Sequence, residues 1–126
     1  MEEGTVKNKK ILIVDDDEWN QYLMQEILEK DGYSFDVALN GEEAVTKVKS
    51  SGVGLVFMDI RMPVMNGYES SRAIRAFNKD IPIIALTAHA MEWVPEKCFA
   101  AGMNDFVSKP FDSETIKRSI ENWMKC

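Results

Sequence analysis

The chain has 126 residues and a mass of 14.3 kDa, and 45% of its residues are hydrophobic while 29% are charged, which is the composition of one globular domain. Its net charge of −6 argues against a nucleic-acid-binding surface and against adhesion to an anionic membrane, because both require clustered basic residues. No apolar run reaches the length of a membrane span and the N-terminus lacks the character of a signal peptide, so we expect a cytoplasmic protein. Cys98 and Cys126 lack metal-binding spacing and are predicted to be reduced thiols.

The N-terminal part of the chain predicts a tail, a buried strand and a helix. Residues 1–8 are polar and are expected to form a flexible tail before one domain over residues 9–126. Residues 11–14 form an unbroken aliphatic run, typical of a parallel strand that is buried on both faces, and acidic residues occupy the next four positions. A helical pattern follows over residues 18–30.

Two aromatic residues of this helix fall outside its apolar stripe. Tyr22 lies nearly opposite the stripe, and Trp19 lies to its side. They are either partly exposed residues without a function or a docking surface beside the acidic residues. The sequence alone favours the first alternative, because single exposed aromatic residues are common on protein surfaces.

The middle of the chain predicts two more strands and the helix between them. Residues 35–39 alternate only partly, which favours a strand near the edge of the sheet. Asn40 is expected to cap the next helix, with Glu43 in a capping-box arrangement. Residues 55–58 form another buried strand, which ends at Asp59. Open α/β sheets place ligands at the carboxyl ends of their strands, so Asp59 is either a functional carboxylate or the cap of the following turn.

The C-terminal half predicts two strands and three helices. A helix over residues 68–77 is expected to direct Ile74 and Phe77 to the core, and residues 83–86 form a buried strand that ends at Thr87. The remaining predicted elements are a helix over 91–101, a strand over 105–108 that ends before Lys109 and Pro110, and a helix after Asp112 with an apolar stripe at residues 116, 120, 123 and 124.

Functional groups stand at the ends of four of the five predicted strands: Asp15 and Asp16, Asp59, Thr87, and Lys109 before Pro110. This set, in this order, resembles the receiver domain of two-component response regulators. The local sequences at residues 58–63, 66–69, 85–91 and 101–105 most resemble receivers of hybrid histidine kinases. The resemblance implies an α/β fold, namely a doubly wound (βα)5 flavodoxin-like sandwich with a five-stranded parallel sheet in the order 2-1-3-4-5.

The resemblance also implies how these residues act together. Asp59 accepts a phosphoryl group from a phosphohistidine donor, in a reaction that depends on Mg²⁺ or Mn²⁺. Asp16, Asp59 and the backbone carbonyl of Arg61 bind the cation directly, and Asp15 contributes to the metal site through a coordinated water. Lys109 pairs with the phosphoryl oxygens. A transferring phosphoryl group carries dispersed negative charge and the carboxylate adds more, so a cation and a fixed ammonium group are needed to hold them together.

A switch and a control of its lifetime follow from the same resemblance. Thr87 donates its hydroxyl to the phosphoryl group. Phe106 either changes rotamer in response, which alters the surface of the fourth helix, fifth strand and fifth helix, or is an ordinary core residue. Arg61 and His89 flank the path of the hydrolytic water and set the phosphorylation lifetime. The peptide bond between Lys109 and Pro110 is expected to be cis.

Three other classes of protein fit the pattern less well. An aspartate-nucleophile phosphatase of the haloacid-dehalogenase type needs a second aspartate two residues after Asp59, where Arg61 stands. A flavin-binding protein needs a phosphate-binding loop after the first strand, where residues 15–17 are acidic and would repel phosphate. A protein-interaction module that keeps the fold without phosphorylation is the main alternative, although such a module usually lacks one of the acids or the lysine.

The expected partners are a histidine kinase or a histidine phosphotransfer protein. Homodimerisation that depends on phosphorylation is a further alternative, whereas neither nucleic acid nor membrane is expected to contact this domain. The domain is not predicted to be an independent enzyme, although it would promote its own phosphorylation and autodephosphorylation. It is either a single-domain regulator or a fragment of a hybrid histidine kinase.

Overall fold

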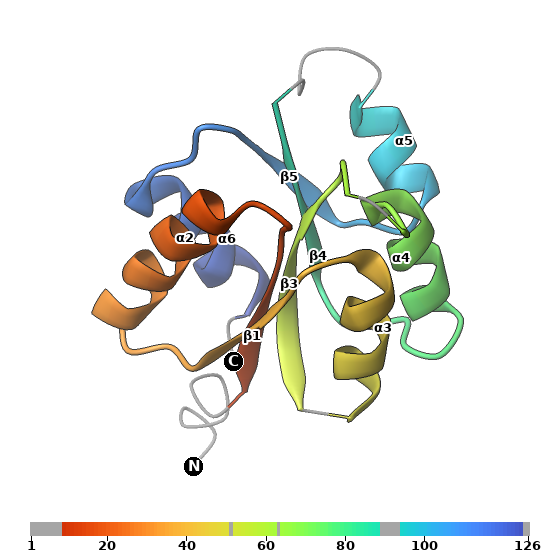
Figure 1. The fold of residues 1–126 in the computed structure, drawn as a ribbon, viewed down its shortest axis with the longest axis horizontal. Helices are drawn as coiled ribbons and strands as arrows, with labels where there is room; N and C mark the ends of the chain where they lie inside the picture. Colours follow the sequence, from red (N-terminus) through yellow and green to blue (C-terminus); the bar gives the residue numbers. More distant parts are fainter. Residues whose placement is uncertain (1–8, 51, 63, 89–93, 125–126) are drawn as a thin grey trace.

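The computed structural model describes residues 9–50, 52–62, 64–88 and 94–124, which form one parallel sheet with helices on both faces (Figure 1). The strands are β1 Lys10–Val14, β2 Phe35–Ala38, β3 Val53–Asp59, β4 Ile83–Thr87 and β5 Asp105–Ser108. The helices are α2 Glu18–Lys30, α3 Gly41–Ser50, α4 Gly67–Arg75, α5 Val94–Ala100 and α6 Ser113–Trp123. The strand order is β2-β1-β3-β4-β5, which confirms the predicted topology and the edge position of β2.

The sheet separates two hydrophobic cores, which explains the unbroken aliphatic runs of the sequence. Successive side chains of a strand point to opposite faces, so Leu12 and Ile13 of β1 belong to different cores. Helices α2 and α6 cover one core, and α3, α4 and α5 cover the other (Figure 1). Because both faces are covered, strands β1, β3 and β4 need apolar side chains at nearly every position.

The register of the sheet brings the carboxyl ends of its strands to one edge. Val14 pairs with Met58, so Asp15 and Asp59 extend from neighbouring strands at the same level. Thr87, the last residue of β4, pairs with Ser108 of β5. The polar residues that the sequence places after separate strands therefore lie beside one another in the fold.

The loops after β2 and β3 are fixed by helix caps. Asn40 caps α3 as predicted, because the Glu43 N–H donates to its Oδ1 at 2.8 Å. The Glu43 carboxylate, however, accepts from the N–H of Leu39 at 2.6 Å, one residue earlier than in a standard capping box. A complete capping box, which we did not predict, joins Asn66 and Glu69 at the start of α4.

One side chain expected in the core is exposed instead. Helix α4 ends at Arg75, so Phe77 lies beyond it on the surface, where the ammonium group of Lys49 lies 5.3 Å from its ring centroid. The expectation that Phe77 packs in the core was wrong. In the stripe of α6, Trp123 is partly exposed, and its indole N–H donates to Asp105 Oδ2 at 3.1 Å.

The remaining predictions concern the end of α5, the two cysteines and the length of the helices. Helix α5 ends at Ala100, and Gly102 follows it with a φ of 94° that favours glycine. Residues 91–93, which the sequence placed in this helix, lie outside the described residues. Cys98 is a buried free thiol, whereas Cys126 lies outside the described residues. None of the described helices is both long and apolar enough to cross a bilayer.

Candidate functional site

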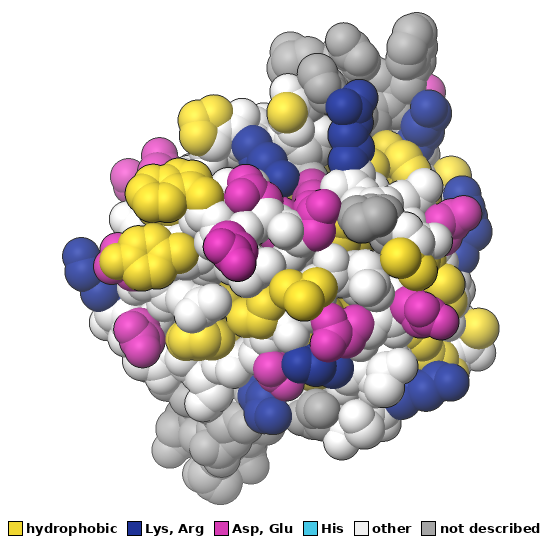
Figure 2. All heavy atoms as spheres, in the orientation of Figure 1, with side chains coloured by type: hydrophobic (Ala, Val, Ile, Leu, Met, Phe, Trp, Pro, Cys, Tyr) yellow, Lys and Arg dark blue, Asp and Glu magenta, His cyan; other side chains and the backbone are white. Residues whose placement is uncertain are grey.

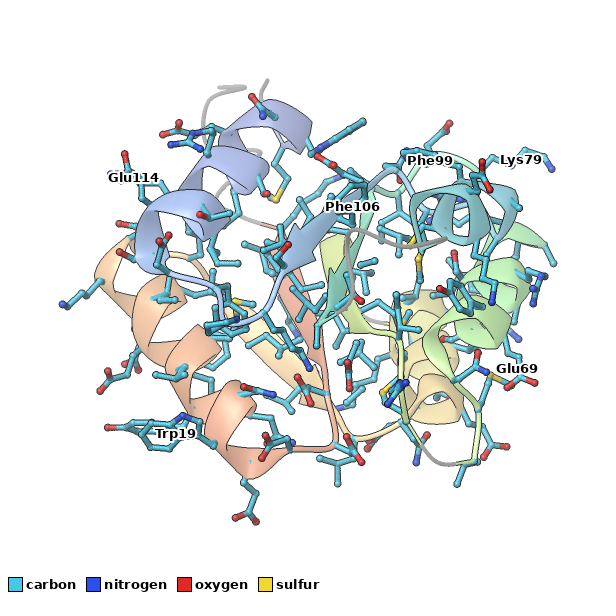
Figure 3. The ribbon with its side chains drawn as sticks, turned by 90° about the horizontal axis from the view of Figure 1, so that it is seen from above. Trp19, Glu69, Lys79, Phe99, Phe106 and Glu114 are labelled. Atoms are coloured by element: carbon cyan, nitrogen blue, oxygen red, sulfur yellow. The ribbon has the colours of Figure 1, made fainter. Side chains whose placement is uncertain are left out.

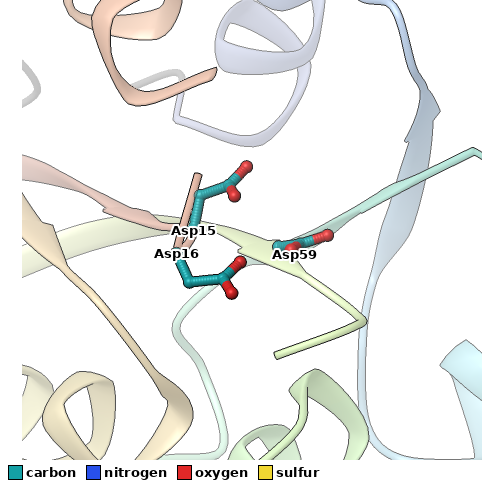
Figure 4. Close-up of side chains that lie close together, drawn as sticks. All are labelled: Asp15, Asp16 and Asp59. Carbon is teal, nitrogen blue, oxygen red and sulfur yellow. The ribbon is translucent and has the colours of Figure 1, made fainter. Parts of the chain in front are cut away.

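Three carboxylates meet at the carboxyl edge of the sheet. Asp15 and Asp16 follow β1 and Asp59 ends β3, and one oxygen from each lies within 4.8 Å of the others (Figure 4). Asp15 is only 1% exposed and Asp59 only 6%, whereas Asp16 is exposed. Figure 2 shows acidic side chains gathered on this side of the molecule, beside large hydrophobic side chains over α2. The site is therefore strongly negative and is partly shielded from water.

Lys109 is the cation that faces these carboxylates. Its Nζ lies 2.9 Å from Asp59 Oδ1 and 3.5 Å from Asp15 Oδ2. The backbone N–H of Lys109 donates to the carbonyl of Thr87 at 2.8 Å, which fixes the residue beside the end of β4. The peptide bond between Lys109 and Pro110 is cis, as the resemblance implied.

One ammonium group does not compensate two buried carboxylates. Burial raises the pKa of Asp15 to about 6, against the opposing effects of the Asp17 N–H and of Lys109. Burial also raises the pKa of Asp59, although the Lys109 ammonium opposes the shift. For Lys109, burial favours the neutral form, but the two carboxylates outweigh it and raise its pKa. The metal-free site therefore still favours additional positive charge.

A hard divalent cation fits this set of ligands. Asp15 Oδ2 is buried and has no hydrogen-bond partner among the described residues, and the Lys109 ammonium group faces it at 3.5 Å. A buried carboxylate oxygen without a hydrogen bond is costly, and a cation bound by several oxygens reduces that cost. The carboxylates of Asp15, Asp16 and Asp59 supply oxygens that lie close enough together to bind one cation. Carboxylate oxygens favour Mg²⁺, Mn²⁺ or Ca²⁺ over metals that prefer sulfur or nitrogen ligands.

The carboxylates open into a cavity of about 760 Å³. Its wall contains the predicted residues Asp15, Asp16, Asp59, Arg61, Thr87 and Lys109. Residues that we did not assign to the site also line it: Met62, Asn66, Tyr68, Ala88 and Lys97, together with Asp17, Asn20, Ile60 and Leu86. His89 lies outside the described residues, so its predicted position is not tested.

Phe106 does not line the cavity but lies close to it, because β5 pairs with β4. The β4–β5 register pairs Ala85 with Phe106 and Thr87 with Ser108. Because side chains alternate along a strand, Thr87 and Phe106 are diagonal neighbours on the same face. The ring of Phe106, labelled in Figure 3, is partly buried and packs against the core under α3, α4 and α5.

The aromatic residues of α2 lie beside the acidic end of β1. Trp19 is 63% exposed and projects outward from the first turn of α2 (Figure 3). Its ring centroid lies 6.0 Å from that of the exposed Tyr22, and the Tyr22 hydroxyl donates to Glu26 at 2.8 Å. The prediction that both rings leave the apolar stripe is confirmed, and their use in docking stays a prediction.

The sheet order and the acid–lysine cluster at its carboxyl edge define an α/β domain of the receiver class. The family model for the response regulator receiver domain matches residues 11–121, and the chain belongs to this family. It is 40% identical over 128 residues to hybrid signal transduction histidine kinase C of Dictyostelium discoideum, covering 93% of this chain but 10% of that protein. It is 29% identical over 143 residues to histidine kinase 5 of Arabidopsis thaliana, covering 91% of this chain and 16% of that protein. The chain thus spans a small part of the length of these relatives.

Solved structures show the same fold. The receiver domain of the sensor histidine kinase PA1611 of Pseudomonas aeruginosa, with a magnesium ion in its active site cleft, has a TM-score of 0.86 and 36% identity, covering 92% of this chain and 97% of that chain. A co-crystal structure contains the receiver domain of Saccharomyces cerevisiae Ssk1 with the histidine phosphotransfer protein Ypd1. It matches with a TM-score of 0.87 and 33% identity, covering 92% of this chain and 88% of that chain.

Proposed function

We propose that this receiver accepts a phosphoryl group on Asp59 from a phosphohistidine donor protein. The observation that carries this proposal is the contact of 2.9 Å between Lys109 Nζ and Asp59 Oδ1 beside two further carboxylates. A buried carboxylate that faces an ammonium group inside an open cavity can act as a nucleophile toward a phosphoryl group. The donor is a histidine kinase or a histidine phosphotransfer protein, which agrees with the hybrid kinases among the relatives.

The transfer exchanges one bond of phosphorus for another. A carboxylate oxygen of Asp59 forms the new P–O bond, while the P–N bond of the phosphohistidine breaks and its electron pair stays on the imidazole nitrogen. Asp59 must be deprotonated to attack, and Lys109 favours that form against the effect of burial. Lys109 then pairs with the phosphoryl oxygens as the negative charge of the site increases.

The chain's own ligands for Mg²⁺ are Asp15, Asp16 and Asp59, with the backbone carbonyl of Arg61 as a further oxygen. When bound, the cation would neutralise the negative charge of the carboxylates and of the incoming phosphoryl group. The buried Asp15 oxygen that lacks a hydrogen bond supports this assignment, as does the magnesium ion in the related Pseudomonas receiver. Mn²⁺ has similar ligand preferences and is expected to substitute.

The response to phosphorylation involves Thr87 and Phe106. The Thr87 hydroxyl donates to the phosphoryl group, and its displacement toward Asp59 leaves space for the ring of Phe106 on the same face of the sheet. Movement of this ring changes the surface formed by α5, β5 and α6. If the phosphorylated domain forms a homodimer, this surface is the expected interface. Arg61 and His89 set the lifetime of the phospho-aspartate.

The receiver is proposed to occupy residues 9–126, with a tail over residues 1–8, and to form part of a hybrid histidine kinase. It promotes its own phosphorylation and autodephosphorylation without being an independent enzyme, and it works in the cytoplasm. The alternative is a phosphorylation-independent interaction module, which nothing in the ligand set favours because Asp15, Asp16, Asp59 and Lys109 are all present.

The test is phosphorylation of wild type and Asp59→Asn by acetyl phosphate with Mg²⁺, followed by intact-protein mass spectrometry. Wild type is expected to gain one phosphoryl group and Asp59→Asn none, while a matched surface variant, Asp80→Asn, behaves as wild type. Titration with Mg²⁺ and then beryllofluoride should change the fluorescence of Trp19, since the backbone N–H of Trp19 donates to Asp17, which lines the cavity. An unmodified wild-type protein that also shows no fluorescence response would support the interaction module.

A further inference from the structure

Lys97 is a cation of the cavity wall to which the proposed chemistry gives no role. It lies on α5, whereas the three clustered carboxylates extend from β1 and β3. Its side chain is exposed, and it forms no ion pair with any other residue that the structure describes. Lys109, by contrast, is already paired with Asp59 and Asp15. The positive charge of Lys97 is therefore available to an anion that enters the cavity.

The part of α5 that carries Lys97 is held against α4. The Ser71 hydroxyl donates to the carbonyl of Ala101 at 3.0 Å, and Arg75 Nε donates to the carbonyl of Gly102 at 2.8 Å. Both acceptors directly follow α5, which ends at Ala100. These bonds fix the backbone close to Lys97, so its ammonium group stays beside the cavity within the reach of one side chain.

The charge of the cavity wall changes sign when a divalent cation binds. The charged side chains of the wall are four carboxylates and three cations: Asp15, Asp16, Asp17 and Asp59, with Arg61, Lys97 and Lys109. With all of them ionised, the wall carries one net negative charge and favours a cation. A bound divalent cation leaves one net positive charge, which favours an anion such as a phosphoryl group. Lys97 contributes to both of these preferences, with opposite effects on the two ions.

The effect of Lys97 does not require direct contact with the bound ion. Lys97 and Asp59 line the same cavity of about 760 Å³, so their separation is comparable with the Debye length of about 8–10 Å in physiological salt. Solvent screening therefore weakens their interaction without abolishing it. We expect one unit charge at this position to change the affinity for a singly charged ion about two- to fivefold, and that for a divalent ion by more.

We propose that Lys97 attracts the anionic phosphoryl group to this receiver and repels the divalent cation, so that it strengthens the binding of the first and weakens the binding of the second. The inference rests on the proposed function of Asp59 as phosphoacceptor. Lys109 acts by contact with Asp59, whereas Lys97 acts across the cavity. Lys97 thus sets how readily the site takes an anionic phosphodonor at a given concentration of Mg²⁺.

The decisive variant is Lys97→Gln, which removes the charge and keeps most of the side chain. It should bind Mg²⁺ at least about twofold more tightly than wild type. At saturating Mg²⁺, it should bind beryllofluoride, an anion, about two- to fivefold more weakly. Calorimetric titration of the whole chain measures both affinities. Opposite changes for the cation and the anion identify a charge effect, because damage to the site would weaken both.

Two control variants and the salt concentration separate charge from structure. Lys97→Arg keeps the charge and should match wild type. Lys79→Gln makes the same change of charge at an exposed residue in the loop before β4, at the amino edge of the sheet (Figure 3), and should leave both affinities unchanged. The difference between Lys97→Gln and wild type should shrink between about 0.05 M and 0.5 M salt, because the Debye length shortens.

Each remaining outcome has a definite meaning. Affinities of Lys97→Gln that equal those of wild type, or that are lower for both ions, overturn the proposal. A difference that does not change with salt also overturns it, because a contact rather than a charge would then be responsible. Wild type that binds no beryllofluoride at saturating Mg²⁺ and is not labelled by acetyl phosphate refutes the proposed function of Asp59 itself.

Discussion

Replacing Asp15 with asparagine should stabilise the metal-free protein, although it removes a proposed metal ligand. The pKa of Asp15 rises from 3.8 to about 6 because the carboxylate is buried. Each unit corresponds to 1.36 kcal/mol, so the ionised form costs the fold about 3 kcal/mol. Asparagine keeps the acceptor for the Asp17 N–H but loses the attraction to Lys109, so we expect a net gain of about 1–2 kcal/mol at pH 8.

The pH dependence identifies the cause of this gain. With a folded-state pKa above the unfolded value, Asp15 binds its proton more tightly in the folded state. Its contribution to stability is therefore fully present below pH 3.8 and is lost as the pH rises through about 6. The advantage of Asp15→Asn over wild type should be large at pH 8 and should shrink towards pH 4.5.

Urea unfolding of both proteins in EDTA, across this pH range, measures the difference directly. Addition of Mg²⁺ should then stabilise wild type but not Asp15→Asn, because a ligand stabilises only the state that binds it. Lower stability of Asp15→Asn at pH 8, or a difference that does not change with pH, would refute the argument that an uncompensated buried carboxylate dominates the site.

Three further predictions concern single positions. Asn66→Ala removes the capping box of α4 and should lower the free energy of unfolding by about 1 kcal/mol in urea, with Asn66→Asp close to wild type. Gly67→Ala places a Cβ 2.5 Å from the Asp59 carbonyl oxygen, so it should lower stability and weaken beryllofluoride binding, while the exposed Gly52→Asn should do neither. Arg61→Ala and His89→Ala should each change the decay rate of phospho-Asp59 by more than about threefold, and unchanged decay in both would remove them from the control of lifetime.

The sequence predicted the features that depend on burial along a strand. An unbroken aliphatic run such as residues 55–58 fits a parallel strand with helices on both faces better than any other element. The polar residue that follows each run therefore lies at the carboxyl edge of the sheet. The strand order came only from the family resemblance. Features that depend on contacts between distant residues were missed, because Tyr68 and Lys97 enter the cavity wall only when α4 and α5 pack beside it. Phe77 was placed wrongly because its helical spacing shows neither that α4 ends at Arg75 nor that the Lys49 ammonium group meets its ring at the surface.

The separation of the site residues along the chain has a consequence for folding. Lys109 and Asp59 are 50 residues apart, and they meet only when β5 has paired with β4. Contacts of such high sequence separation form late and slowly, because long loops must close before they contribute energy. A partly folded chain that has assembled β1 and β3 would hold its carboxylates together without their lysine. Competence for phosphorylation thus appears in one step with the completed sheet, so a phosphorylation assay counts only molecules that have finished folding.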